Sequence, residues 1–175
     1  MAAGRCRLLA AATVLALAPW IAGCGWEPVY ANREDRPATA ALQAISVNPI
    51  PERTGQQLEM GLRNAFNPTG APVKQRYRLT VSLETSLYST GIQSQGLGTR
   101  GEVHITARYS LTDLATNKTV QTGFVHSSDA FDIQANGYST VVAQDDAARR
   151  DIEEIRREIV ARLTLFMEGK EPVAS

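Results

Sequence analysis

The residue with the most distinctive chemistry is Cys24, which stands between two glycines directly after an apolar stretch. The chain has only one other cysteine, Cys6. A thiol is a strong nucleophile and therefore a site for covalent modification. The segment before Cys24 indicates which modification to expect.

The first 23 residues are typical of an export signal. Arg5 and Arg7 precede an apolar block over residues 8–21. This block is shorter than the roughly 20 residues of a membrane-spanning helix but suits the apolar part of a signal peptide. We therefore predict a signal peptide over residues 1–23 that is removed from the mature protein.

The letters IAGC, residues 21–24, have the order of a bacterial lipobox, in which the cysteine thiol takes a diacylglycerol before the signal is cut. We predict this lipidation at Cys24; the alternative is an ordinary signal peptide with an incidental cysteine. Cys6 lies in the discarded part, which leaves no pair for a disulfide. Several acyl chains on one residue form a lasting membrane anchor. By similarity to enterobacterial lipoproteins, Gly25 after the cysteine is compatible with the outer membrane.

Length and charge narrow the possible functions. Without residues 1–23, which hold two arginines and no acidic residue, 152 residues remain with 16 basic and 18 acidic side chains. This length suits one domain, which needs no metal or disulfide to fold. A net charge near zero argues against a nucleic-acid-binding protein.

Apolar periodicity predicts an α+β fold. We expect a lipidated anchor and flexible tether over residues 24–43, a domain over residues 44–167 and a disordered tail over residues 168–175. Within the domain, the patterns predict four strands, over residues 44–48, 77–87, 103–111 and 120–126, and two amphipathic helices, over residues 54–66 and 140–167. Thr54 and Gln57 suggest a capping box for the first helix. The predicted order is β-α-β-β-β-α, with both helices on one face of a largely antiparallel sheet.

The strand alternation also predicts the polar face of this sheet. Residues 77, 79, 81 and 83 are apolar, and so are residues 103–111 at odd positions. Arg78, Arg108 and His104 therefore belong to the opposite face, exposed to water or to a hydrophilic partner.

The residue types offer little catalytic chemistry. His104 and His126 are the only histidines, and neither lies in a nucleophile motif. The sequence contains no phosphate-binding loop and no spacing typical of metal ligands. Glu102, Asp129 and Asp132 would suit a hydrolase if they met in space. We expect no enzyme activity, cofactor or metal, and a tethered hydrolase stays open as an alternative.

The sequence resembles the LptE family of lipopolysaccharide-assembly lipoproteins, especially its alphaproteobacterial branch. The resemblance covers essentially the whole mature chain. It rests on the lipobox followed by CGWEPVY, on the order of the predicted elements, and on the segments LTDLATNKTV and QDDAARRDIEEIRREIVARL. It implies a lipid-anchored protein on the periplasmic face of the outer membrane, which plugs and helps assemble the LptD β-barrel and supports transport of lipopolysaccharide.

The resemblance also suggests basic residues that contact lipopolysaccharide. The position after the second strand corresponds to Arg100, and weaker candidates are Lys74, Arg76, Arg78 and Arg108. A second family position, in the loop before the last helix, has no counterpart, because residues 119–148 contain no Lys or Arg. A lipid-anchored auxiliary subunit of an ABC-type lipid exporter is the alternative function.

Overall fold

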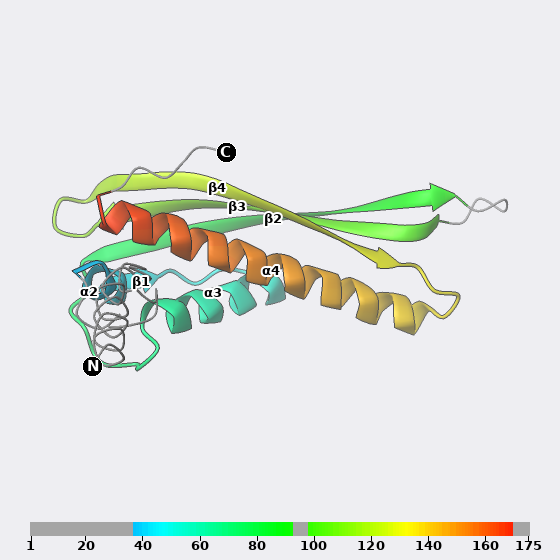
Figure 1. Cartoon of the computed structure of the whole chain (residues 1–175), viewed down its shortest axis with the longest axis horizontal. Coiled ribbons are helices and arrows are strands. Elements are labelled where there is room, and N and C mark those ends of the chain that lie inside the picture. Colours follow the sequence, from blue (N-terminus) through cyan, green and yellow to red (C-terminus); the bar gives the residue numbers. More distant parts are fainter. Residues whose placement is uncertain (1–36, 93–97, 170–175) are drawn as a thin grey trace, which may run out of the picture. The chain divides into compact units, whose positions relative to one another are not determined.

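The computed structural model describes residues 37–92 and 98–169, which belong to one compact unit. Figure 1 shows a sheet with helices on one side of it. The elements in chain order are α2 (Pro37–Gln43), β1 (Ile45–Val47), α3 (Arg53–Phe66), β2 (Tyr77–Ile92), β3 (Gly98–Asp113), β4 (Lys118–Asp132) and α4 (Gly137–Met167).

The sheet has the strand order β1-β2-β3-β4. β1 is parallel to β2, and the other two pairings are antiparallel. Helix α4 packs on β4 and β3, while α3 packs on β1 and α4. The predicted α+β class, with a largely antiparallel sheet covered on one face, is confirmed.

The core lies between the sheet and the helices, on the side where the apolar residues of the strands were predicted to lie. Leu79 and Val81 of β2 are buried opposite Leu111 and Tyr109 of β3. The helices contribute apolar stripes that include Leu58 and Leu62 of α3 and Ile152, Ile155, Ile159 and Leu163 of α4. Each helix therefore gives one face to the core and leaves its polar face to solvent.

The two long helices begin in different ways. Asn136 caps α4 by accepting a hydrogen bond from the Tyr138 backbone N–H at 3.0 Å, so this helix begins three residues before the predicted start. The predicted capping box of α3 is wrong. That helix begins at Arg53, so Thr54 lies inside its first turn, and no side chain caps it.

Residues 37–43 form the helix α2, although the sequence analysis assigned them to the flexible tether. The segment has no apolar periodicity, so its sequence did not predict this short helix. Its proline stands at the first helical position, where a missing N–H costs nothing. Because α2 packs against α4 and α3, the ordered body begins earlier than residue 44.

The strands β2, β3 and β4 are all longer than predicted, because glycine and hydroxyl residues interrupt the apolar alternation near their ends. A register irregularity between Leu111 and Thr112 shifts the last pairs of β3 and β4. The turn that follows β3 is closed by Asp113, whose carboxylate accepts the backbone N–H groups of Ala115 and Thr116 at 2.8 and 3.1 Å. This turn brings Lys118 back beside Asp113.

Candidate functional surface

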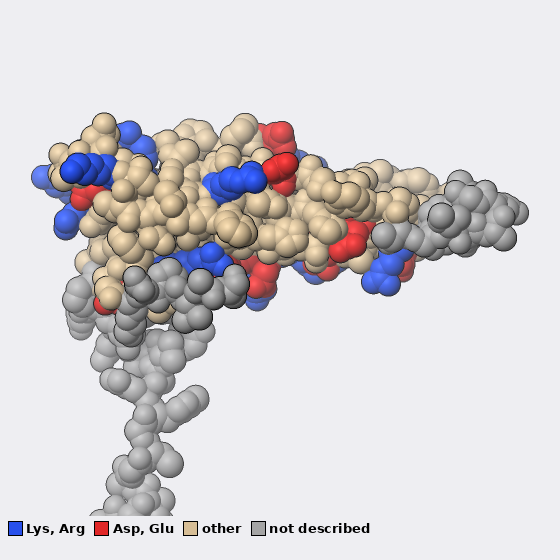
Figure 2. All heavy atoms as spheres, turned by 90° about the horizontal axis from the view of Figure 1, so that it is seen from above, with Lys and Arg blue, Asp and Glu red and all other residues tan. Residues whose placement is uncertain are grey.

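The face of the sheet that carries no helix is rich in hydroxyl groups. Thr80, Ser82, Thr106, Ser110 and Thr112 point to this outer face, in alternation with the core residues of β2 and β3. In Figure 2, charged side chains are sparse along the middle of the molecule, while Lys and Arg gather at the end where β2 begins. The outer face thus offers many neutral hydrogen-bonding groups and few charges.

Arg108 lies in the middle of this outer face, as predicted. Its guanidinium donates to the Glu84 carboxylate at 3.0 Å, and both side chains are about two-thirds exposed. The carboxylate balances the arginine charge, and an exposed pair of this kind contributes little stability. Arg108 is therefore a weaker anion ligand than the sequence alone suggests.

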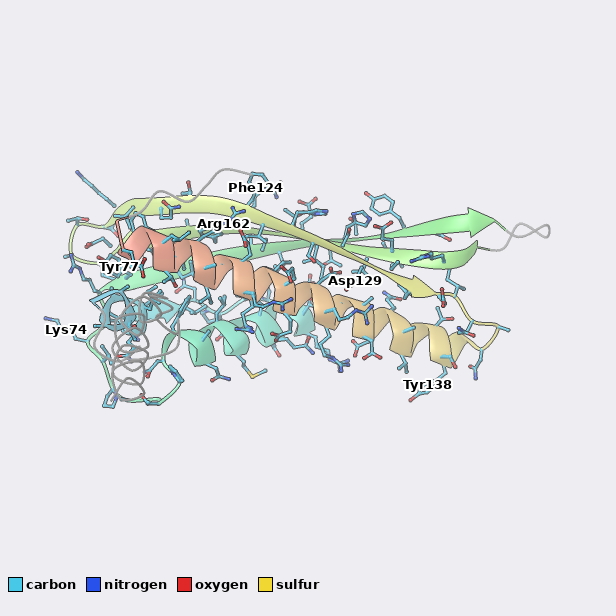
Figure 3. The ribbon with its side chains drawn as sticks, in the orientation of Figure 1. Lys74, Tyr77, Phe124, Asp129, Tyr138 and Arg162 are labelled. Atoms are coloured by element: carbon cyan, nitrogen blue, oxygen red, sulfur yellow. The ribbon has the colours of Figure 1, made fainter. Side chains whose placement is uncertain are left out.

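A basic end of the sheet is formed by Lys74, Arg76, Arg78 and Lys118, which are all exposed. Arg76 lies 3.8 Å from Asp113 and stacks 5.2 Å from the centre of the Tyr77 ring. Figure 3 shows Lys74 at this extremity. Among the described residues, Asp113 is the one carboxylate paired with these four side chains, so the end carries net positive charge. Such a surface suits phosphate or carboxylate groups.

Lys118 was missed as a candidate in the sequence analysis, because 40 residues separate it from Arg78. The pairing of β3 with β4 brings it to the same end of the sheet, where Arg78 faces Thr112 and Lys118 faces Asp113. Its only sequence signal is its place at the end of the turn segment TDLATNK.

Arg100 lies far from the basic end. It is exposed near the start of β3, where it faces Asp132 of β4. Thr112, the partner of Arg78, is twelve positions further along β3, and an extended strand of twelve residues spans about 40 Å. The five predicted basic candidates therefore do not form one site.

Both histidines lie on the outer face, in a diagonal row of rings that the sequence analysis did not foresee. Tyr88 meets His104 edge to face with centroids 4.8 Å apart, and His126 follows at 5.6 Å. Phe124, two residues along β4, is 64% exposed. Glu102 lies 3.3 Å from His104. This row presents apolar area in a polar surface, which is typical of a contact surface.

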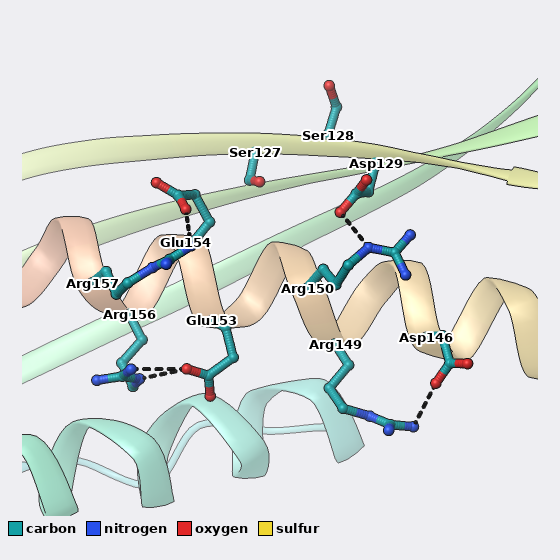
Figure 4. A pocket seen from close by; sticks show the side chains of 10 residues that line it. All are labelled: Ser127, Ser128, Asp129, Asp146, Arg149, Arg150, Glu153, Glu154, Arg156 and Arg157. Carbon is teal, nitrogen blue, oxygen red and sulfur yellow. Dashed lines mark hydrogen bonds and ion pairs between the residues drawn. The ribbon is translucent and has the colours of Figure 1, made fainter.

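A shallow hollow lies between β4 and α4, and its charged side chains are paired (Figure 4). Arg150 donates to Asp129 at 3.0 Å, and Arg149 lies 3.1 Å from Asp146. Further along α4, Arg156 is paired with Glu153 and Arg157 with Glu154. Each arginine that lines this hollow has a carboxylate partner, so the hollow does not attract anions strongly.

Asp151 is the one buried carboxyl group of α4. Its side chain is fully buried, and one oxygen accepts a hydrogen bond from the Ser127 hydroxyl at 2.6 Å. The other oxygen has no partner among the described residues. Burial raises the pKa of Asp151, an effect that the Ser127 bond reduces and the nearby Asp129 increases. The group joins α4 to β4 inside the core and is out of reach of a substrate.

The acidic residues considered for a hydrolase do not converge. Glu102 lies on the outer face beside His104, whereas Asp129 forms an ion pair with Arg150 of α4. Asp132 is exposed opposite Arg100. In the described part of the chain, no cluster of three or more metal-ligating side chains is present. Within residues 37–92 and 98–169, no helix is both long and apolar enough to span a membrane.

The fold and this surface define a small α+β body with an open, polar sheet face, which is suited to docking. A model of the LptE family, described as lipopolysaccharide-assembly, matches residues 42–163. The chain therefore belongs to the LptE family, whose members are non-catalytic lipoproteins of lipopolysaccharide transport and outer-membrane assembly.

Solved structures have the same fold. A lipoprotein from Caulobacter crescentus is 23% identical with a TM-score of 0.60, over 76% of this chain and 97% of that chain. A minor lipoprotein from Acinetobacter baumannii is 17% identical with a TM-score of 0.53, over 70% and 90%. Lipoprotein B from Nitrosomonas europaea is 10% identical with a TM-score of 0.53, over 71% and 83%. No match is found among curated proteins.

Proposed function

We propose that this LptE-family protein is an outer-membrane lipoprotein that plugs the LptD β-barrel, helps it assemble and supports insertion of lipopolysaccharide. The observation that carries the proposal is the family match over residues 42–163, which covers nearly all of the folded body. Docking is then its expected mode of action, and LptD its expected partner.

The surface chemistry supports the role of a plug. The lumen of a large outer-membrane barrel is polar, so a plug needs a polar exterior around its own apolar core. The outer sheet face supplies hydroxyl groups such as those of Thr80 and Ser110. The exposed side of α4 supplies ion pairs such as Arg149–Asp145, whose charges are already balanced. These ion pairs reduce the charge that must be desolvated inside the lumen, although Arg78 and Arg100 of the outer face have no ion-pair partner among the described residues.

Attachment to the membrane rests on Cys24, the proposed lipidation site. Pro37, where the described body begins, is thirteen positions further along the chain. An extended chain of this length spans at most about 45 Å. The lipid would therefore hold the body on the periplasmic face of the outer membrane, close enough to engage a barrel embedded there.

The basic end and Arg100 are the proposed contacts for lipopolysaccharide, which carries phosphate and carboxylate groups. Arginine matches such groups with a planar set of donors. Among the described residues, Arg78 and Arg100 have no ion-pair partner, unlike Arg108. We expect Arg78→Gln and Arg100→Gln each to weaken lipopolysaccharide binding severalfold. Arg157→Gln, at an arginine of α4 that is paired with Glu154, is the matched control and should bind normally.

Depletion tests the proposed function. Without this protein, LptD should accumulate in a misassembled form, and the cells should become permeable to large antibiotics. The measurements are the amount of correctly assembled LptD in the envelope and the sensitivity of the cells to such antibiotics. Normal assembly of LptD after full depletion would contradict the proposal.

A further inference from the structure

The edge of β2 that faces β1 is open along most of its length. β1 pairs with only the first three residues of β2, up to Leu79, whereas β2 continues to Ile92, thirteen positions further along. After β1, Asn48 bonds once more to this edge, because its backbone N–H donates to the Leu79 carbonyl at 2.9 Å. Pro49 and Pro51 then end the pairing, since neither has an N–H to donate.

Alternate residues of β2 direct their backbone groups to this open edge. The bond from Asn48 shows that the Leu79 carbonyl points away from β3, and antiparallel pairing repeats this direction at every second residue. The N–H and C=O groups of Thr85, Leu87 and Ser89 therefore lie on the open edge. Among the described residues, β2 has no neighbouring strand other than β1 and β3.

The open edge lacks the usual protection against pairing. Natural edge strands carry prolines or charged residues that block another strand. Beyond Leu79, β2 contains no proline and one charged residue, Glu84. That carboxylate accepts from Arg108 at 3.0 Å on the outer face, so its charge is balanced. Such an edge recognises an extended polypeptide, because a strand offers donors and acceptors at the same spacing.

The inner face beside this edge, which is the face that packs on the helices, keeps exposed apolar area. Helix α3 begins at Arg53, which lies 3.8 Å from Asp145 of α4, so residues 137–144 of α4 extend beyond α3. Tyr138 in this part of α4 is 77% exposed, and Leu87 on the inner face of β2 is 56% exposed. Figure 3 shows Tyr138 at the end of the molecule toward which β2 runs. An added strand therefore finds both backbone partners and apolar contacts here.

We propose that the open edge of β2 holds one transmembrane strand of the barrel partner while that barrel assembles. The inference rests on the proposed function, which supplies the partner and the role in assembly. A strand that spans the membrane in a barrel has about 9–11 residues, which fits along the thirteen open positions of β2. Barrel strands are apolar on one side and polar on the other. On β2, the apolar side would lie beside Leu87 and the polar side beside Glu84 and Ser86.

Charge supports the choice of this occupant. Charges on the lipid-facing side of a barrel strand are destabilising, so this side is normally uncharged. The residues that the open part of β2 gives to the inner face are uncharged as well, including Leu83, Thr85 and Leu87. Every strand of a closed barrel is paired on both sides. The strand is therefore available to β2 only before closure, and one copy of the protein serves one barrel.

A charge on the inner face tests the proposal in cells, with the full-length protein and its anchor. Leu87→Asp places a carboxylate against the apolar side of the added strand and should slow the formation of correctly assembled LptD severalfold. Met60→Asp is the matched control, because Met60 of α3 is 59% exposed and lies away from the edge. It should leave the rate of LptD assembly unchanged. A normal rate with Leu87→Asp, or equal slowing by the two variants, would overturn the proposal.

Photo-cross-linking identifies the occupant in the same cells. A photoreactive side chain in place of Ser89 lies at the open edge of β2, and one in place of Ser128 lies at the far edge of the sheet, on β4. We expect the Ser89 position to cross-link to newly synthesised LptD and the yield to fall as the barrel closes. A yield that is the same before and after closure, or no higher than at Ser128, would refute the binding of a strand during assembly.

Hydrogen exchange measures the backbone pairing without a substitution. Synthetic peptides with the sequences of the LptD strands should slow the exchange of the N–H groups of Thr85, Leu87 and Ser89, whereas scrambled peptides should not. The N–H groups of Glu84 and Ser86 bond to β3 and should be protected throughout. Equal slowing by scrambled peptides, or slowing that follows the concentration of the protein alone, would contradict the proposal.

The two proposals fail in different ways. If LptD assembles normally with Leu87→Asp but misassembles after depletion, the pairing of β2 with a barrel strand is wrong and the proposed function stands. Normal LptD assembly after depletion would contradict the proposed function itself.

Discussion

The two faces of the sheet are built from alternate residues of the same strands, yet they differ in burial and in polarity. The inner face of β3 presents Val103, Ile105 and Leu111 to the helices, and all three are buried. The outer face presents Thr106, Arg108 and Ser110. We therefore expect stability to depend on the inner face and the proposed recognition of partners to depend on the outer face.

The largest effect is expected from the inner side. Ile155→Ala removes a fully buried side chain of α4 and leaves a cavity against the sheet. Such truncations cost about 2–5 kcal/mol. Chemical denaturation should show this loss in the free energy of unfolding. A loss below about 1 kcal/mol would show that the inner face does not dominate stability.

The next largest loss of stability is expected from a substitution at Gly101, over which the Phe131 ring packs. The two residues face each other across β3 and β4, and a Cβ atom at Gly101 would lie 2.2 Å from the Phe131 ring. Because the ring must move, Gly101→Ala should destabilise the fold by about 1–3 kcal/mol. The double variant Gly101→Ala/Phe131→Leu should lose less than the sum of its single variants, which thermal unfolding can measure.

Asp151 makes the inner side sensitive to pH. Because burial raises its pKa in the folded state, the folded protein holds this proton more tightly than the unfolded chain does. Its contribution to stability is therefore full below the ordinary pKa of aspartate and is lost as the pH rises through the raised value. Asp151→Asn cannot titrate and should lack this loss. Parallel slopes of unfolding free energy against pH in the two proteins would contradict this role.

The smallest effect on stability is expected on the outer face. Arg108→Ala removes the exposed ion pair with Glu84 and should change the free energy of unfolding by less than about 0.5 kcal/mol. Chemical denaturation of Arg108→Ala and Ile155→Ala under the same conditions compares the two losses directly. A loss of unfolding free energy comparable to that of Ile155→Ala would contradict the expectation that the outer face contributes little to stability.

Sequence alternation was enough to predict the two faces, because burial on one side of a strand imposes a period of two. The amphipathic stripe of α4 was predictable for the same reason, with its own period. The helix α2 was not, because seven residues with a proline and several alanines carry no clear period. The assembly of Lys118 with Arg78, and of Tyr88 with His104, depends on strand register, which no local pattern encodes.

The direct test of the central claim is isolation of the full-length, affinity-tagged protein from detergent-solubilised envelopes, followed by mass spectrometry. The account predicts that an integral outer-membrane β-barrel of the LptD type is recovered in near-equal amount, together with Cys24 carrying lipid at the mature N-terminus. Recovery of an inner-membrane ATPase complex instead, or of an unlipidated chain without a barrel, would contradict it.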